Sequence, residues 1–149
     1  MGNFKKLEWR SVHGKIEDTN IQEVEKALGI QFPDDYIQCI KENNGGHPIK
    51  EVYDFGKHKE AVFDRLLNFL PEKPNYIVHV YNSVIDRMLK DIYCFAEDPF
   101  GNLICFDYRE KDRREPSIVF WDHEIASESP EKAISHVCDS FSQLLNILY

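Results

Sequence analysis

The chain has 149 residues, a length typical of one domain, and its 42% hydrophobic content is too high for a disordered chain. The formal net charge of −8 disfavours sequence-independent binding to nucleic acids. It favours a basic partner, although an acidic charge also serves solubility alone. No apolar run reaches the roughly 18 residues of a membrane span, and "MGNFKKLEWR" lacks the apolar core of a secretory signal. We therefore expect a cytoplasmic protein.

The first 18 residues predict a short basic arm ahead of the rest of the chain. Within the first fifteen residues the basic side chains outnumber the single acidic one, Glu8; they are Lys5, Lys6, Arg10 and Lys15. Neither a repeat nor a long linker rich in Gly, Ser or Pro divides the remaining residues. We predict one continuous domain over residues 1–149, with residues 1–18 as the arm.

Two helices are predicted directly after the arm. Residues 20–28 place apolar side chains on one helical face and are followed by a glycine that can end the helix. In "FPDDYIQCIKENNGG", Pro33 suits the first helical position, and Asp34 and Asp35 complement the positive end of the helix dipole. The Asn and Gly residues at 43–46 tolerate the left-handed backbone of a helix exit, so the second helix is expected to end there.

The remaining segments predict a mixture of strands and helices. Short strands are expected near 51–55 and 63–69, and residues 76–88 carry apolar side chains at helical spacing. After a hairpin, "SIVFWDHE" at 117–124 predicts another strand. Residues 134–148 predict an amphipathic C-terminal helix with the apolar positions Ile134, Val137, Phe141, Leu144, Leu145 and Leu148. Helices and strands are thus segregated along the chain, which predicts an α+β fold with a mostly antiparallel sheet flanked by helices.

The hairpin is predicted from "IYCFAEDPFGNLICFDY", with "DPFG" as its turn. If those four residues form the loop, Cys94 lies opposite Cys105 and Glu97 lies opposite Asn102. Both faces of the two strands are then apolar. We therefore expect these strands at the centre of a covered sheet.

The run Asp122-His123-Glu124 is a candidate for metal binding or acid–base chemistry. Successive side chains of a strand point to opposite faces, so an unbroken strand separates His123 from its two acidic neighbours. The three side chains then cannot converge on one ion, although a pair of carboxylates without the histidine remains possible. The plainer interpretation is the polar end of a strand that leaves the core.

Other catalytic and metal-binding patterns are missing from the sequence. It contains no Cys-x-x-Cys, no His-Glu-x-x-His, no Gly-x-Ser-x-Gly and neither phosphate-binding glycine motif. The four cysteines stand in apolar contexts, which predicts buried, reduced thiols; they are Cys39, Cys94, Cys105 and Cys138. We predict that the protein is not an enzyme and that it has no cofactor and no metal site.

Several segments together resemble a known family. "IQEVEKALGIQFPDDYIQCIKENNGG" resembles the N-terminal signature of the SUKH superfamily, which includes the Smi/Knr-type proteins: a glutamate-bearing helix, a Leu-Gly exit, Pro-x-x-Tyr and an Asn-Gly-Gly ending. "FAEDPFGNLICFDY" resembles its hairpin, "VFWDHE" the following strand and "SFSQLLNIL" the last helix. The resemblance spans about residues 20–148 in the right order.

This resemblance implies an α+β fold and, for bacterial members, an immunity role. Such proteins bind and neutralise a cognate polymorphic toxin, often a nuclease, without catalysis; some eukaryotic relatives are regulatory scaffolds instead. No catalytic residues carry over. A nuclease tends to present a basic cleft, which an acidic domain can cover. We predict contacts from acidic and aromatic residues near turns and strand ends: Asp34, Asp35, Glu97, Asp98, Phe100, Asp122 and Glu124. Helix starts and turns favour Asp in any case, so a purely structural role is the alternative.

Overall fold

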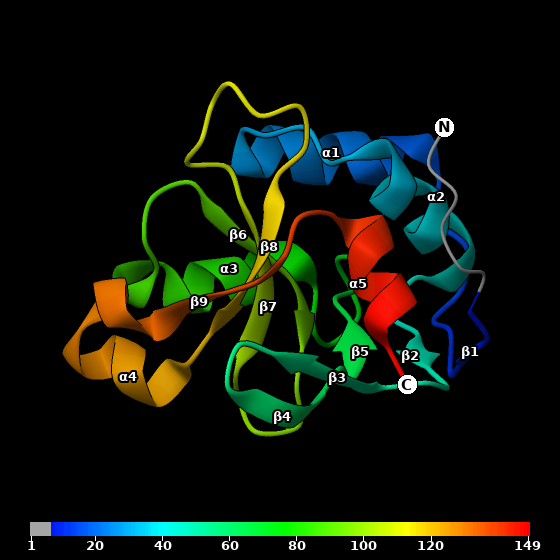
Figure 1. Cartoon of the computed structure of the whole chain (residues 1–149). Coiled ribbons are helices and arrows are strands. Elements are labelled where there is room, and N and C mark those ends of the chain that lie inside the picture. The colour runs from blue at the N-terminus through cyan, green and yellow to red at the C-terminus, as the bar shows by residue number, and fades with distance from the viewer. Residues whose placement is uncertain (1–6) are drawn as a thin grey trace.

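A five-stranded sheet runs through the middle of the computed structural model, which describes residues 7–149 (Figure 1). Its strands are β5 (Arg65–Leu66), β6 (Ile92–Glu97), β7 (Leu103–Asp107), β8 (Ser117–Trp121) and β9 (Ile134–Cys138). They lie in chain order, and each neighbouring pair is antiparallel. The short β5 therefore stands at one edge of the sheet and β9 at the other.

Helices α1 (Asp18–Leu28), α2 (Asp34–Asn43) and α5 (Phe141–Ile147) lie on one side of this sheet (Figure 1). Helix α3 (Ile77–Val84) packs against β6 and α1, and the 3-10 helix η1 (Ile85–Arg87) continues it. Helix α4 (His123–Glu128) and the 3-10 helix η2 (Pro130–Ala133) connect β8 to β9. The predicted α+β class with a mostly antiparallel sheet is confirmed, and so is a helix within 76–88.

Two small antiparallel sheets complete the fold. β1 (Trp9–Arg10) pairs with β2 (His47–Pro48), and β3 (Val52–Phe55) pairs with β4 (His58–Val62). The strand predicted near 51–55 is confirmed, whereas the one at 63–69 is reduced to the two residues of β5. Strand β4 was not predicted, because its sequence "HKEAV" is largely exposed and lacks alternating apolar residues.

The core is organised around Tyr36 of α2, whose side chain is fully buried. Its ring centroid lies 5.4 Å from Phe95 of β6, 5.0 Å from Phe106 of β7 and 5.3 Å from Phe141 of α5. All three contacts are edge-to-face, an arrangement that aromatic quadrupoles favour. One tyrosine thus holds two helices and two central strands together.

Local hydrogen bonds set the ends of the first two helices. Helix α1 begins two residues before the predicted start, at Asp18, and Glu17 N–H donates to Asn20 Oδ1 at 2.8 Å. It ends as predicted at Gly29, whose φ of 74° is left-handed and whose N–H donates to Glu25 O at 2.7 Å. The Glu25 carboxylate also accepts from Phe32 N–H at 2.7 Å. Glu25 therefore links the exit of α1 to the approach of α2.

The predicted hairpin is confirmed, with a change in its register. Cys94 lies opposite Cys105 as expected, but Glu97 lies opposite Leu103 and not opposite Asn102. The shift comes from an irregularity between Cys94 and Ala96, which leaves Phe95 without a cross-strand partner. A bulge of this kind adds one residue to a strand and cannot be read from alternation. Most residues of both strands are buried, as predicted for central strands.

The predicted C-terminal helix is wrong over its first part. Ile134 and Val137 belong to strand β9, and α5 begins only at Phe141. Apolar residues three apart fit both a helix and a bulged strand, and pairing with β8 decides for the strand. His136, which the sequence places on a helix, is likewise a strand residue.

The four cysteines are buried and free, as predicted. Burial raises the pKa of Cys39, Cys94 and Cys138 to about 12, and it raises that of Cys105 well above its usual value. These thiols therefore stay protonated at neutral pH. The predicted basic arm lies partly outside the described residues, which include neither Lys5 nor Lys6, and the domain boundaries stay a prediction.

Candidate protein-binding surface

Two of the segments that carry predicted contact residues lie side by side: the β6–β7 turn at 98–102 and the start of α4. His123 N–H donates to Asn102 Oδ1 at 3.0 Å. Gly101 has a φ of 90°, and a Cβ there would stand 3.3 Å from the His123 ring. Glycine therefore meets both the backbone geometry and the close approach of the ring.

Asp98 gives the turn its shape. Its Oδ1 accepts from the N–H groups of Phe100 and Asn102, both at 2.8 Å, and its Oδ2 accepts from Asn102 Nδ2 at 2.9 Å. Asp98 is only 8% exposed. Its carboxylate therefore acts inside the turn, and it positions the neighbouring side chains.

Asp122 begins helix α4. Strand β8 ends at Trp121, and Asp122 Oδ1 accepts from Glu124 N–H at 2.9 Å and from Ile125 N–H at 3.1 Å. These are the bonds of a helix N-cap. The interpretation of residues 117–124 as one strand is therefore wrong at its polar end. Among residues 7–149, no group of three or more His, Cys, Asp or Glu side chains could hold a metal ion.

The exposed residues of the turn and helix combine acidic and apolar character. Phe100 at the turn is 70% exposed and Ile125 on α4 is 42% exposed. Glu124 and Glu128 on α4 are also exposed, and the helix carries no Lys or Arg. We call these four residues, Phe100, Glu124, Ile125 and Glu128, the turn–helix surface. An exposed aromatic beside carboxylates suits contact with a basic protein.

Glu97 lies at the base of the same turn, and its carboxylate is partly buried and hydrogen-bonded within the fold. Its carboxylate accepts from Asn75 Nδ2 at 2.6 Å, and Glu97 lies opposite Arg65 in the register of β5 and β6. Burial raises the pKa of this carboxyl group. The fold thus uses Glu97 to fasten the loop before α3 to the sheet, and its predicted contact role stays untested.

The other two predicted contact residues lie elsewhere, at the start of α2. Asp34 is exposed. Asp35 is partly buried, and its Oδ2 accepts from the backbone N–H and the hydroxyl of Ser142 at 2.9 Å and 2.7 Å. Asp35 therefore fastens the start of α5 to the start of α2. Its carboxylate also accepts from Tyr36 N–H at 2.8 Å.

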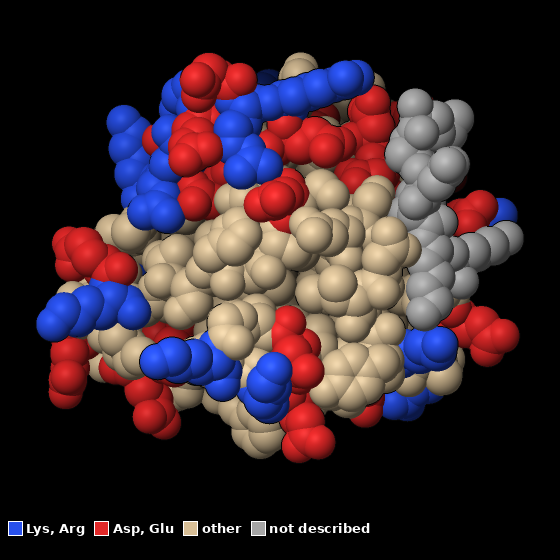
Figure 2. Space-filling model, in the orientation of Figure 1, with Lys and Arg blue, Asp and Glu red and all other residues tan. Residues whose placement is uncertain are grey.

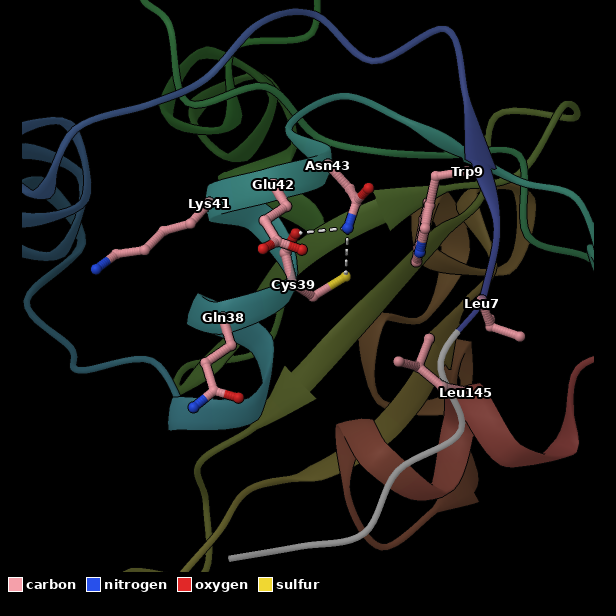
Figure 3. A pocket seen from close by; sticks show the side chains of 8 residues that line it. All are labelled: Leu7, Trp9, Gln38, Cys39, Lys41, Glu42, Asn43 and Leu145. Carbon is pink, nitrogen blue, oxygen red and sulfur yellow. Dashed lines mark hydrogen bonds between the residues drawn. The ribbon is translucent and has the colours of Figure 1, made fainter.

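A groove of about 570 Å³ lies between β1, α2 and α5 (Figure 3). Figure 3 shows Cys39 and Asn43 of α2 facing Trp9 of β1, with Leu145 of α5 beside them. The Asn43 amide donates to Cys39 O at 3.0 Å. With a pKa of about 12, the Cys39 thiol is no nucleophile at neutral pH. The sequence did not predict the groove, because the pairing of β1 with β2 brings Trp9 to α2.

The Asn-Gly-Gly segment after α2 has a structural role as well. Asn44 is fully buried; its Oδ1 accepts from Phe69 N–H and its Nδ2 donates to Asn68 Oδ1, both at 2.9 Å. Gly45 has a φ of 71°, and a Cβ there would lie 2.9 Å from the His13 ring. Tyr36 and Asn44, two of the residues that carry the family resemblance, are thus buried in the core. The strands and helices that these segments form define a class of fold, an antiparallel sheet backed by α1, α2 and α5.

Comparison with known proteins identifies the family. A family model described as SUKH_6, SMI1-KNR4 cell-wall, matches residues 18–145, which is most of the chain. The protein therefore belongs to the SMI1-KNR4 family of the SUKH superfamily, as the sequence motifs indicated. No curated protein matches the chain. Over residues 7–149, the structure contains no helix of the length and apolar character that a membrane span requires.

Proposed function

We propose that the protein is a cytoplasmic immunity protein that binds and neutralises a cognate toxin, a basic nuclease domain, without catalysis. The observation that carries the proposal is the turn–helix surface, where the turn that exposes Phe100 contacts the start of the acidic helix α4. Membership of the SMI1-KNR4 family is consistent with such a role.

The two kinds of side chain on this surface have different tasks in the proposal. Carboxylates such as Glu124 speed the encounter with a basic cleft, because opposite fields steer association. Phe100 supplies the apolar contact that holds the complex, since aromatic residues at the centre of an interface contribute most of its affinity. The net charge of −8 supports the choice of a basic partner.

Co-expression with the toxin encoded beside the gene tests the proposal. We expect the protein to restore growth of cells that produce the toxin and to co-purify with it. Toxicity that persists, with no complex recovered, would contradict an immunity role.

A pair of charge-reversal variants tests the surface itself. Glu124→Lys should slow association with the toxin at low salt, because a steering carboxylate becomes repulsive. Glu23→Lys makes the same change at an exposed position of α1, at the opposite end of the molecule (Figure 1), and should leave the association rate close to wild type. Equal rates for both variants would remove α4 from the interface.

A regulatory interaction module of the Smi/Knr type, without a toxin partner, is the second candidate. The family description as cell-wall SMI1-KNR4 favours it. The two candidates differ in genomic context, because an immunity gene lies beside a toxin gene. A locus without such a neighbour, together with capture of a non-toxic protein through α4, would support the regulatory module.

A further inference from the structure

The C-terminal part of the chain forms a face that carries almost no charge. Asp139 is the single Asp, Glu, Lys or Arg between Ala133 and Tyr149, in a chain that is 30% charged. Figure 2 shows uncharged side chains across the middle of this view, where Figure 1 places β9 and α5, and charged side chains around them. We call the surface of these two elements the β9–α5 face. An uncharged centre with a charged rim is typical of protein interfaces.

This face includes an edge strand that carries no Lys, Arg, Asp, Glu or Pro, and its only irregularity lies near its end, at Val137. Edge strands of natural sheets commonly carry Lys, other charges or Pro, which prevent pairing with another chain. Strand β4, at the edge of a small sheet, follows this rule with Lys59 and Glu60. Strand β9 has the sequence "ISHVC", which contains none of these residues. Its edge is therefore open to strand addition in the three residues before the irregularity at Val137.

The register of β9 determines which backbone groups face outward. Asp122 N–H donates to Ala133 O at 3.0 Å, and hydrogen-bonded pairs alternate along an antiparallel ladder. The next hydrogen-bonded pair is therefore Phe120 with Ser135. Ile134 and His136 stand on either side of Ser135, in the pairs that are not hydrogen-bonded. Their backbone N–H and C=O groups therefore point away from β8.

We propose that the β9–α5 face binds a second copy of this chain through antiparallel pairing of the two β9 strands. A two-fold axis at Ser135 places Ile134 of one copy opposite His136 of the other, so that all outward backbone groups find partners. The two sheets become one continuous sheet. This inference goes beyond the immunity role and does not depend on it.

The self-complementary register of β9 and the charge of the chain together favour a second copy as the occupant. Each copy carries −8, so acidic surfaces of two copies repel each other, and a face without charge lets them approach. A basic toxin finds only one carboxylate, that of Asp139, between Ala133 and Tyr149. Increasing salt is therefore expected to strengthen the pairing of two copies, because it screens their repulsion and breaks no ion pair between them.

Sedimentation equilibrium of the purified protein alone tests the proposal. We expect a reversible monomer–dimer equilibrium, and Ser135→Lys should weaken the dimer at least about tenfold, because it places two like charges at the axis. Ser83→Lys adds the same charge at an exposed position of α3 and should leave the equilibrium unchanged. A wild-type protein that stays monomeric at all concentrations overturns the proposal, whether or not the toxin binds.

A covalent test is independent of variants that could disturb folding. Ser135→Cys should give a disulfide-linked dimer on mild oxidation, because residues opposite each other at a two-fold axis have close Cβ atoms. The four native thiols are buried and should not react, and Ser83→Cys is the matched control. His136→Pro removes one outward N–H, so the dimer loses a backbone hydrogen bond and should weaken. The monomer should still fold, because an edge strand tolerates proline where its N–H faces outward. Equal cross-linking at both cysteine positions would contradict the β9 pairing.

Discussion

The turn–helix surface and the β9–α5 face follow one another closely along the chain but differ in physical character. The first combines Phe100 with the acidic side chains of α4, whereas the second has one charged residue between Ala133 and Tyr149. A charged surface attracts an opposite partner over a distance, while an uncharged edge pairs only after contact. The two proposals therefore assign different partners to two surfaces of one small domain, and changes in one surface should leave the other intact.

Among variants that should affect one surface and not the other, Phe100→Ala is expected to have the largest effect. The side chain is 70% exposed, so its loss should hardly change the free energy of unfolding. It should weaken toxin binding about 30-fold or more if Phe100 is the central anchor, and it should not change self-association. Calorimetric titration with the toxin measures the first effect and sedimentation the second. Ile49→Ala, at another exposed apolar residue, is the control; an equal loss there would argue against a specific anchor.

Asp98→Ala tests whether the hydrogen bonds of Asp98 hold the shape of the turn. The variant removes the acceptor of three hydrogen bonds, so the free energy of unfolding should fall by about 2 kcal/mol in a urea titration. Toxin binding should also weaken, because Phe100 loses its fixed position. Asp112→Ala removes an exposed acid from a loop and should change stability by less than about 0.5 kcal/mol. Similar stabilities of the two variants would mean that Asp98 does not hold the turn.

Salt should act in opposite directions on the two surfaces. Between low and physiological ionic strength, toxin affinity should fall several-fold as steering is screened, while the dimer becomes tighter. Both constants can be measured on the same preparation. If both interactions weaken with salt, charged contacts contribute to the dimer, and the distinction between the two faces fails.

The smallest effect is expected from Glu97→Gln. Burial raises the pKa of Glu97, so the folded state favours the neutral acid, and this stabilising contribution is present at low pH and lost as pH rises through the folded pKa. The variant should therefore unfold at a slightly higher temperature than wild type at about pH 7. At about pH 4 the two unfolding temperatures should be the same. Toxin binding should not change. A clear loss of toxin binding would place Glu97 in the interface.

The elements with strong local signals were predictable from the sequence. Helix α1 with Gly29, helix α2 after Pro33 and the hairpin with Cys94 opposite Cys105 follow from periodicity and turn chemistry. The β9 strand was not, because its apolar spacing also fits a helix and only pairing with β8 decides. The N-cap Asp122 was hidden for a similar reason, since an apolar strand directly precedes it.

The candidate site was predictable in part. Acidic and aromatic residues near turns included Phe100 and Glu124, which are exposed, but also Asp35 and Asp98, whose carboxylates are engaged within the fold. Sequence position alone does not distinguish these cases, because Asp is favoured in turns and helix starts whether or not it contacts a partner. Hydrogen-bond partners far along the chain make the distinction.

The link between Asp35 and Ser142 also bears on when the fold can be completed. It joins residues separated by 107 positions, and Tyr36 needs Phe141 of the same late helix to complete its aromatic contacts. Contacts between such distant segments form slowly, because the intervening chain must first be ordered. During synthesis the core thus stays open until α5 has left the ribosome. Under the proposed immunity role, the delay before α5 docks would add to the time between synthesis of the protein and capture of the toxin.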